Sequence, residues 1–198
     1  MVEAPPGDTL TVDESRLEHT AYARLVRKGG GAASSVVSVE AEARARSALV
    51  GDTGICPGAA LGLAVALRSF TLKPRLGWCR GGFSNPGIEA TLDQYDLELS
   101  LTHVRDLDVV SLELGLTVGG SVLVQRFQTQ GVAPRRTTGA LQLSPTVGIT
   151  REIAPRSYLF LLGSASTYLL RSENSAATAS SFGPSFALRI SIGAGYRL

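Results

Sequence analysis

The sequence has no long hydrophobic run. The nearest candidate, residues 57–67, falls short of the roughly 18 to 20 apolar residues that a membrane-spanning helix needs, and glycine and alanine interrupt it. We therefore expect no helical membrane span. The opening residues, MVEAPPGDTL, also lack the basic segment and the apolar core of a secretory signal. This leaves a cytosolic protein, or a mature form or excised module whose signal lies elsewhere.

An excess of charge of one sign is also absent. The 198 residues carry 19 lysines and arginines against 17 aspartates and glutamates, a formal net charge of +2. Such a weak field gives no reason to expect nucleic acid as a partner. Charged residues make up 18% of the chain and apolar residues 44%, a composition that argues against global disorder. The length suits one domain, with or without an appendage.

Residues suited to catalysis or metal binding are scarce. The two histidines are His19, in the N-terminal stretch, and His103, and neither lies in a serine-nucleophile motif. Two cysteines without a nearby histidine do not make a zinc site. We therefore expect no catalytic residue, no cofactor and no metal site, so that the chain is not an enzyme. We expect His103 to be an interfacial residue.

From Ser35 onward the chain alternates apolar and polar residues, the pattern of strands whose two faces differ. Eight stretches show this alternation. The seventh is apolar on both phases at its start, so its faces stay unassigned, and a phase slip at Asp93 and Gln94 predicts a β-bulge. The eight predicted strands are residues 37–46, 60–67, 70–78, 95–102, 110–124, 141–149, 158–170 and 186–198.

Eight long strands with no helical pattern between them predict an all-β fold, an eight-stranded antiparallel up-and-down barrel. Two kinds of barrel fit the alternation. A soluble calycin-like carrier of hydrophobic ligands keeps its apolar face inside, whereas a transmembrane barrel turns that face to lipid. Short connections after the second, fourth and sixth strands, and longer ones after the others, favour the transmembrane barrel. Strands longer than the roughly 5 or 6 residues usual in soluble proteins favour it too.

The polar face of the predicted strands is rich in small residues and in charges of both signs. Small residues suit the narrow interior of an eight-stranded barrel, which side chains can fill. Similar numbers of acids and bases suit a closed interior, because an unpaired buried charge is costly. A solvated surface of mixed sign is the alternative. The predicted lumen charge network comprises Glu40, Glu42, Arg44, Arg46, Lys73, Arg75, Asp96, Glu98, Glu113, Arg189 and Arg197.

The two cysteines fall at the same end of neighbouring strands. Cys56 comes just before the second predicted strand and Cys79 lies at the end of the third, and the two strands form a hairpin that turns near Arg68. In an oxidising compartment this arrangement predicts a disulfide between Cys56 and Cys79. A pair of free buried thiols is the alternative.

The last eight residues, SIGAGYRL, resemble the C-terminal assembly signal of bacterial outer-membrane barrels. Ser191, Gly193, Tyr196 and Leu198 occupy its polar, glycine, aromatic and final hydrophobic positions, although the last residue in that family is usually aromatic. Together with the eight strands, this segment gives a resemblance to the small OmpA/OmpX-type outer-membrane β-barrels over roughly residues 33–198.

The resemblance implies a monomeric barrel in the cell outer membrane. Its partners would be outer-membrane lipid, lipopolysaccharide and the barrel-assembly machinery, and residues 1–32 would form a periplasmic linker or short helix. The expected function is a membrane anchor or a display of surface loops, and the linker-like start favours the C-terminal membrane module of a larger protein with an upstream periplasmic domain. The soluble carrier and a lipid-modifying barrel enzyme stay as alternative classes.

Aromatic residues, at 6% of the chain, are few for such a barrel. Transmembrane barrels carry aromatic belts at both membrane interfaces. We therefore expect Trp78, Tyr95, Tyr158 and Tyr196, with several phenylalanines, to form both belts.

Overall fold

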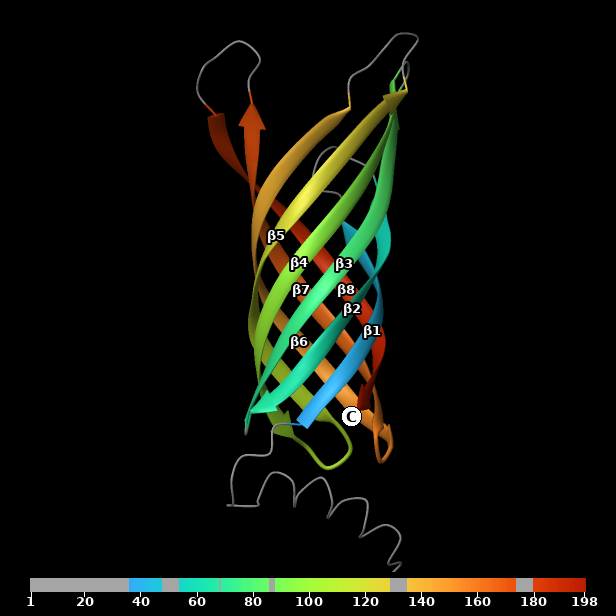
Figure 1. Cartoon of the computed structure of the whole chain (residues 1–198), viewed down its shortest axis with the longest axis vertical. Helices are drawn as coiled ribbons and strands as arrows, with labels where there is room; N and C mark the ends of the chain where they lie inside the picture. Colours follow the sequence, from blue (N-terminus) through green and yellow to red (C-terminus); the bar gives the residue numbers. More distant parts are fainter. Residues whose placement is uncertain (1–35, 48–53, 68, 86–87, 129–134, 174–179) are drawn as a thin grey trace, which may run out of the picture. The chain divides into compact units, whose positions relative to one another are not determined.

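The computed structural model describes residues 36–47, 54–67, 69–85, 88–128, 135–173 and 180–198. They form one closed antiparallel barrel, in which each strand pairs with the next along the chain and β8 pairs with β1 (Figure 1). This confirms the predicted eight-stranded all-β barrel. The predicted tether, residues 1–32, lies outside the described residues. The strands are β1 (Val36–Ser47), β2 (Ile55–Leu67), β3 (Phe70–Asn85), β4 (Ile88–Asp106), β5 (Ser111–Gln128), β6 (Arg136–Ala154), β7 (Ser157–Glu173) and β8 (Ser180–Arg197).

The barrel has two different ends. The connections after β2, β4 and β6 are short and lie at the end that also holds Leu198, which we call the turn end (Figure 1). The strands β1, β3, β5 and β7 end at the opposite end of the barrel, which we call the loop end. The predicted long connection after the third strand is mostly strand, because β3 continues to Asn85 and β4 begins at Ile88.

The strand register fixes which side chains face inward. Ser100 of β4 pairs with Lys73 of β3 and Thr117 of β5, whereas its neighbour Leu99 pairs with apolar residues on both sides. Successive side chains of a strand point to opposite faces. The polar row therefore faces the lumen and the apolar row faces outward.

The distribution of polar and apolar residues is the inverse of that in a soluble protein, because the charged residues are buried and the leucines are exposed. Glu40 and Glu98 are each 2% exposed, whereas Leu61 and Leu97 are 65% and 62% exposed. A wall of exposed leucines fits lipid and would be a large apolar patch in water. The soluble-carrier alternative, which needs its leucines inside, is therefore wrong. In the described part of the chain, no helix is long and apolar enough to cross a membrane.

β7 has apolar side chains on both faces, and three of them enter the lumen. Tyr158, Phe160 and Leu162 are at most 8% exposed. The two aromatic rings fit because β8 presents glycines opposite them, with Tyr158 paired to Gly195 and Phe160 to Gly193. A Cβ atom at either glycine would overlap the facing ring. The prediction that Tyr158 belongs to an interfacial belt is therefore wrong.

The bulge predicted at Asp93 and Gln94 is also wrong. Both residues pair with β3 and β5 without a register shift, and the irregularity recorded between strands lies at Glu152 and Ala154. Asp93 is a polar residue at an outward position, where the apolar wall ends. In the sequence, this polar residue therefore interrupts the alternation of apolar and polar residues, although the strand itself is regular.

Candidate functional site: the charged lumen

The part of the lumen near the turn end holds a cluster of charges around Glu40 of β1. The Glu40 carboxylate accepts hydrogen bonds from Arg75 at 2.7 Å and from the Tyr158 hydroxyl at 2.8 Å. Lys73 lies 3.4 Å from Glu40 and donates a hydrogen bond to Glu113 of β5 at 2.6 Å. Both acids thus have a base within ion-pair distance, which offsets the cost of burying their charge.

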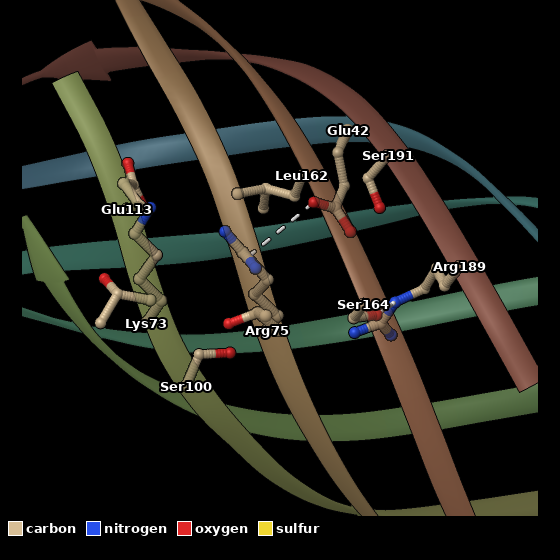
Figure 2. Close-up of a pocket in the computed structure, with 11 residues that line it drawn as sticks. Glu42, Lys73, Arg75, Ser100, Glu113, Leu162, Ser164, Arg189 and Ser191 are labelled. Carbon is tan, nitrogen blue, oxygen red and sulfur yellow. Dashed lines mark hydrogen bonds and ion pairs between the residues drawn. The ribbon is translucent and has the colours of Figure 1, made fainter.

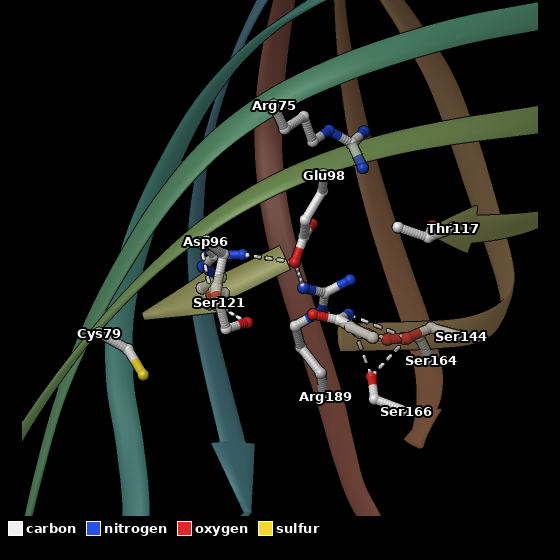
Figure 3. Close-up of polar contacts among 12 residues, drawn as sticks. Arg75, Cys79, Asp96, Glu98, Thr117, Ser121, Ser144, Ser164, Ser166 and Arg189 are labelled. Carbon is white, nitrogen blue, oxygen red and sulfur yellow. Dashed lines mark hydrogen bonds and ion pairs between the residues drawn. The ribbon is translucent and has the colours of Figure 1, made fainter. Parts of the chain in front are cut away.

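A second cluster lies nearer the loop end, around Glu98 of β4 (Figure 3). Arg44 of β1 lies 3.4 Å from Glu98 and 3.4 Å from Asp96, and Arg189 of β8 donates a hydrogen bond to Glu98. Asp96 also accepts a hydrogen bond from Ser121 at 2.6 Å. Bases on β1 and β8 thus hold acids on β4, and the contacts tie non-adjacent strands together.

Short polar side chains fill the lumen beside these clusters. Ser144 donates to Ser166 at 2.7 Å, Gln142 donates to Ser144 at 2.9 Å, and the hydroxyls of Ser100 and Thr117 lie 2.7 Å apart. All five residues are at most 4% exposed. Side chains from β4 to β7 therefore occupy this level of the lumen.

Inward-facing glycines make room for the charged side chains. A Cβ atom at Gly77 of β3 would overlap the guanidinium of Arg44. A Cβ atom at Gly62 of β2 would lie 2.6 Å from Cγ of Arg75, closer than van der Waals contact allows. Small residues on the inner face therefore allow long charged side chains to pack across a narrow barrel.

A small cavity remains between the two clusters (Figure 2). Its volume is about 10 Å³, and its lining includes Glu42, Lys73, Arg75, Glu113 and Arg189. A space of this size holds about one water molecule. It is far too small for a solute.

Three predicted network residues differ from the others. Arg46 is 4% exposed and makes no side-chain hydrogen bond to another described residue, and its guanidinium lies over an aromatic ring of β7. Within the described barrel, Glu42 forms its ion pair with Arg75, whose Nε lies 4.0 Å from the Glu42 carboxylate. Arg197 pairs with Glu152 at the turn end, and its side chain is 30% exposed, so it lies outside the buried clusters.

Two residues of the lumen lining were not predicted from the sequence. Gln94 and Tyr168 are both 0% exposed, and Tyr168 packs with Leu123, Ala140 and Ala187 in an apolar cluster at the loop end. Alternation alone would have placed Gln94 on the same face as Asp96. The bulge predicted at this position excluded Gln94 from the predicted lumen face. Tyr168 lies on the strand whose faces were left unassigned.

The predicted disulfide is confirmed. Cys56 and Cys79, the two cysteines of the chain, are bonded, with their Cα atoms 5.6 Å apart. Both are 3% exposed and have the inward phase of β2 and β3. The bond therefore joins two neighbouring strands inside the lumen at the loop end.

The residues of the predicted assembly signal lie on the strand that closes the barrel. Ser191 and Gly193 have the inward phase, whereas Tyr196 and Leu198 are 48% and 74% exposed. The backbone N–H of Leu198 donates to the Val37 carbonyl at 2.9 Å. The strand has a polar inner face and an apolar outer face, and its role as an assembly signal stays a prediction.

His103 lies at the turn end, exposed on the outer wall, with its ring 5.3 Å from that of Phe70. His19 lies outside the described residues. Among the residues that the structure describes, no group of three or more histidines, cysteines and acids is arranged to hold a metal ion.

No protein-family model and no curated protein sequence matches the chain. Solved structures do match. A major outer membrane protein of Thermus thermophilus aligns with a TM-score of 0.57 at 13% identity, over 83% of this chain and 100% of that one. The neisserial surface protein A (NspA) aligns with a TM-score of 0.52 at 11% identity, over 83% of this chain and 97% of that one. Ail, the attachment invasion locus protein of Yersinia pestis, aligns with a TM-score of 0.50 at 17% identity, over 83% of this chain and 97% of that one.

At these identities the likeness is one of fold. The chain has the fold of the small eight-stranded outer-membrane β-barrels, as its C-terminal segment and strand pattern predicted. The predicted location in the cell outer membrane agrees with these neighbours and with the apolar outer wall.

Proposed function

We propose that the chain is a monomeric outer-membrane anchor, a closed barrel that holds its loops at the cell surface and does not conduct ions. The observation that carries this proposal is the filled lumen, whose charges balance. Among the described residues, the buried lumen acids number five and the buried lumen bases also number five. The acids are Glu40, Glu42, Asp96, Glu98 and Glu113, and the bases are Arg44, Arg46, Lys73, Arg75 and Arg189.

A conducting pore needs a continuous hydrated path, and here ion pairs cross the lumen at two levels. To open a path, Arg44 and Arg189 would have to leave Glu98, and Lys73 would have to leave Glu113. Separating a buried ion pair costs roughly 3–5 kcal/mol, because it leaves an uncompensated charge. A barrel held shut in this way is suited to anchoring rather than to transport.

Planar bilayer recording tests the proposal. The chain is folded in detergent, its folding is checked by heat-dependent migration on gels, and it is added to bilayers in which a known porin gives the positive control. We expect a folded barrel without conductance steps. Reproducible channels from the folded chain would contradict a closed anchor.

Recognition of the C-terminal segment by the barrel-assembly machinery is a second part of the proposal. Its support is the amphipathic β8 and the match of Ser191, Gly193, Tyr196 and Leu198 to the family signal. Tyr196→Ala is expected to lower the yield of assembled barrel in cells and to fold normally in detergent. Ile192→Ala, on the same outer face, is the matched control. Equal yields for the two variants in cells would argue against the signal.

A third part is that the barrel is the C-terminal membrane module of a larger protein, with residues 1–32 as its periplasmic linker. The support is composition, since Pro5-Pro6-Gly7 and Gly29-Gly30-Gly31 are typical of linkers. An immunoblot of whole cells with an antibody against the barrel tests this proposal. A species larger than 20.7 kDa supports an upstream domain, and a species of that mass argues against it.

A further inference from the structure

Three charged side chains stand on the outer wall at the loop end: Arg80 of β3, Asp93 of β4 and Arg126 of β5. Arg80 pairs with Asp93, and Arg126 pairs with Thr91, the next outward residue of β4. All three have the outward phase of their strands. They are therefore separate from the lumen charges and face the surroundings of the barrel.

Asp93 ties the two arginines together. Its carboxylate accepts hydrogen bonds from Nε and Nη2 of Arg80, at 2.8 and 3.2 Å, and lies 3.9 Å from Nη2 of Arg126. The Asp93 side chain is 3% exposed, whereas those of Arg80 and Arg126 are 55% and 58% exposed. One covered acid thus holds two exposed bases, and the outward surface has a surplus of positive charge.

The trio lies at the edge of the apolar wall. Along β3 every outward residue from Phe70 to Trp78 is apolar, and Arg80 is the next outward residue. That span matches the roughly 9 to 11 residues with which a tilted strand crosses a bilayer. Tyr95, the next outward residue of β4 on the turn-end side of Asp93, pairs with Trp78, and such aromatic rings mark the membrane interface. The trio therefore lies at the depth of the lipid headgroups.

We propose that Arg80 and Arg126 bind a phosphate group of a phosphorylated glycolipid in the membrane leaflet at the loop end. This inference rests on the proposed function, because it needs the barrel wall in lipid and the loop end at the cell surface. Guanidinium groups bind phosphate through paired, charge-assisted hydrogen bonds. Asp93 accepts from Nε and Nη2 of Arg80, so that Nη1 of Arg80 and the Arg126 guanidinium would donate to the phosphate. Asp93 is a positioning residue in this site.

The turn end supplies a matched control. Arg105 and Arg151 are exposed on the outward phase of β4 and β6, where they pair with Leu112 and Leu159 rather than with an acid. They share the exposure of Arg80 and Arg126 but lack the acid-held pair. Replacing them changes the net charge by the same amount.

The experiment uses the full chain folded into phosphatidylcholine vesicles, with Trp78 fluorescence as the reporter. Three additions are titrated: lipid A with its phosphates, lipid A after the phosphates are removed, and inorganic phosphate. We expect wild type to bind phosphorylated lipid A about tenfold more tightly than the dephosphorylated form, because charge-assisted hydrogen bonds are lost. The double variant R80Q/R126Q loses this preference, and R105Q/R151Q keeps it. Inorganic phosphate leaves the fluorescence unchanged.

The site is overturned if wild type shows no preference, if R80Q/R126Q keeps it, or if inorganic phosphate reproduces the effect of lipid A. Heat-dependent gel migration is recorded for every sample. A chain that inserts and shows the folded band but has no phosphate preference overturns the glycolipid site alone. A chain that does not insert into vesicles overturns the proposed function.

Discussion

At the residue scale, the buried charges depend on one another. Glu98 is 2% exposed and lies within ion-pair distance of Arg44 and Arg189, which come from two other strands. Arginine does not lose its proton in a protein, so its charge must be compensated where it lies. Glu98 therefore stabilises two guanidinium groups at once.

Glu98→Gln is expected to destabilise the folded barrel by about 3–5 kcal/mol, because it leaves the buried Arg189 without its acid and the buried Arg44 with Asp96 alone. Glu152→Gln is the control, since Glu152 pairs with Arg197 at the surface and such pairs contribute roughly 0–1 kcal/mol. Urea unfolding of the barrel in vesicles measures both. Equal losses of stability would contradict a lumen held by paired charges.

Gly77→Ala is expected to cost about 1–3 kcal/mol, because the added methyl group overlaps the Arg44 guanidinium and must displace it. Gly139→Ala is the matched control on the outer wall, where a Cβ atom meets nothing within 4 Å. Its effect should stay within about 0.5 kcal/mol. The same unfolding assay compares them, and a Gly139→Ala loss as large as that of Gly77→Ala would argue against tight lumen packing.

Much of the lumen could be predicted residue by residue, and the exceptions have physical causes. Glu40 and Glu98 followed from alternation, because a polar inner face and an apolar outer face differ at every step. Tyr158 could not be placed, since β7 is apolar on both faces. Its inward position depends on Gly195 of β8, and that pairing is known only from the register.

At the scale of the elements, all eight strands were predicted, and the limits of several of them were not, mostly at the loop end. The predicted fourth strand covers residues 95–102, whereas β4 runs from Ile88 to Asp106. Alternation between apolar and polar residues marks a strand only where its outer face meets lipid. From Asp93 towards Ile88, β4 lies beyond the apolar part of the outer wall. The strand therefore continues there without the alternation of apolar and polar residues.

The disulfide between β2 and β3 closes a segment with a sequence separation of 23 residues. A loop of that size predicts a stabilisation of about 3 kcal/mol from the lower entropy of the unfolded chain. C56S/C79S should therefore unfold at lower urea concentration and no longer respond to reductant during unfolding. If wild type unfolded with reductant stays as stable as without it, the bond contributes nothing.

At the scale of the whole molecule, the sequence was sufficient to choose between the two kinds of barrel. The deciding features were the length of the strands, the alternation of short and long connections, and the charges of both signs on the small-residue face. The phosphate site on the outer wall was not predictable in this way, because Arg80 and Arg126 are far apart in the sequence. Only the shared neighbour Asp93 brings them together.

Trp78, the one tryptophan of the chain, tests directly whether the apolar wall lies in lipid. It is 40% exposed on the outer wall, near the edge of the apolar zone. In vesicles, we predict strong quenching of its fluorescence by lipids brominated near the headgroup, weaker quenching by lipids brominated near the chain ends, and little quenching by aqueous iodide. Full quenching by iodide with none by brominated lipid would show that the wall faces water instead of lipid.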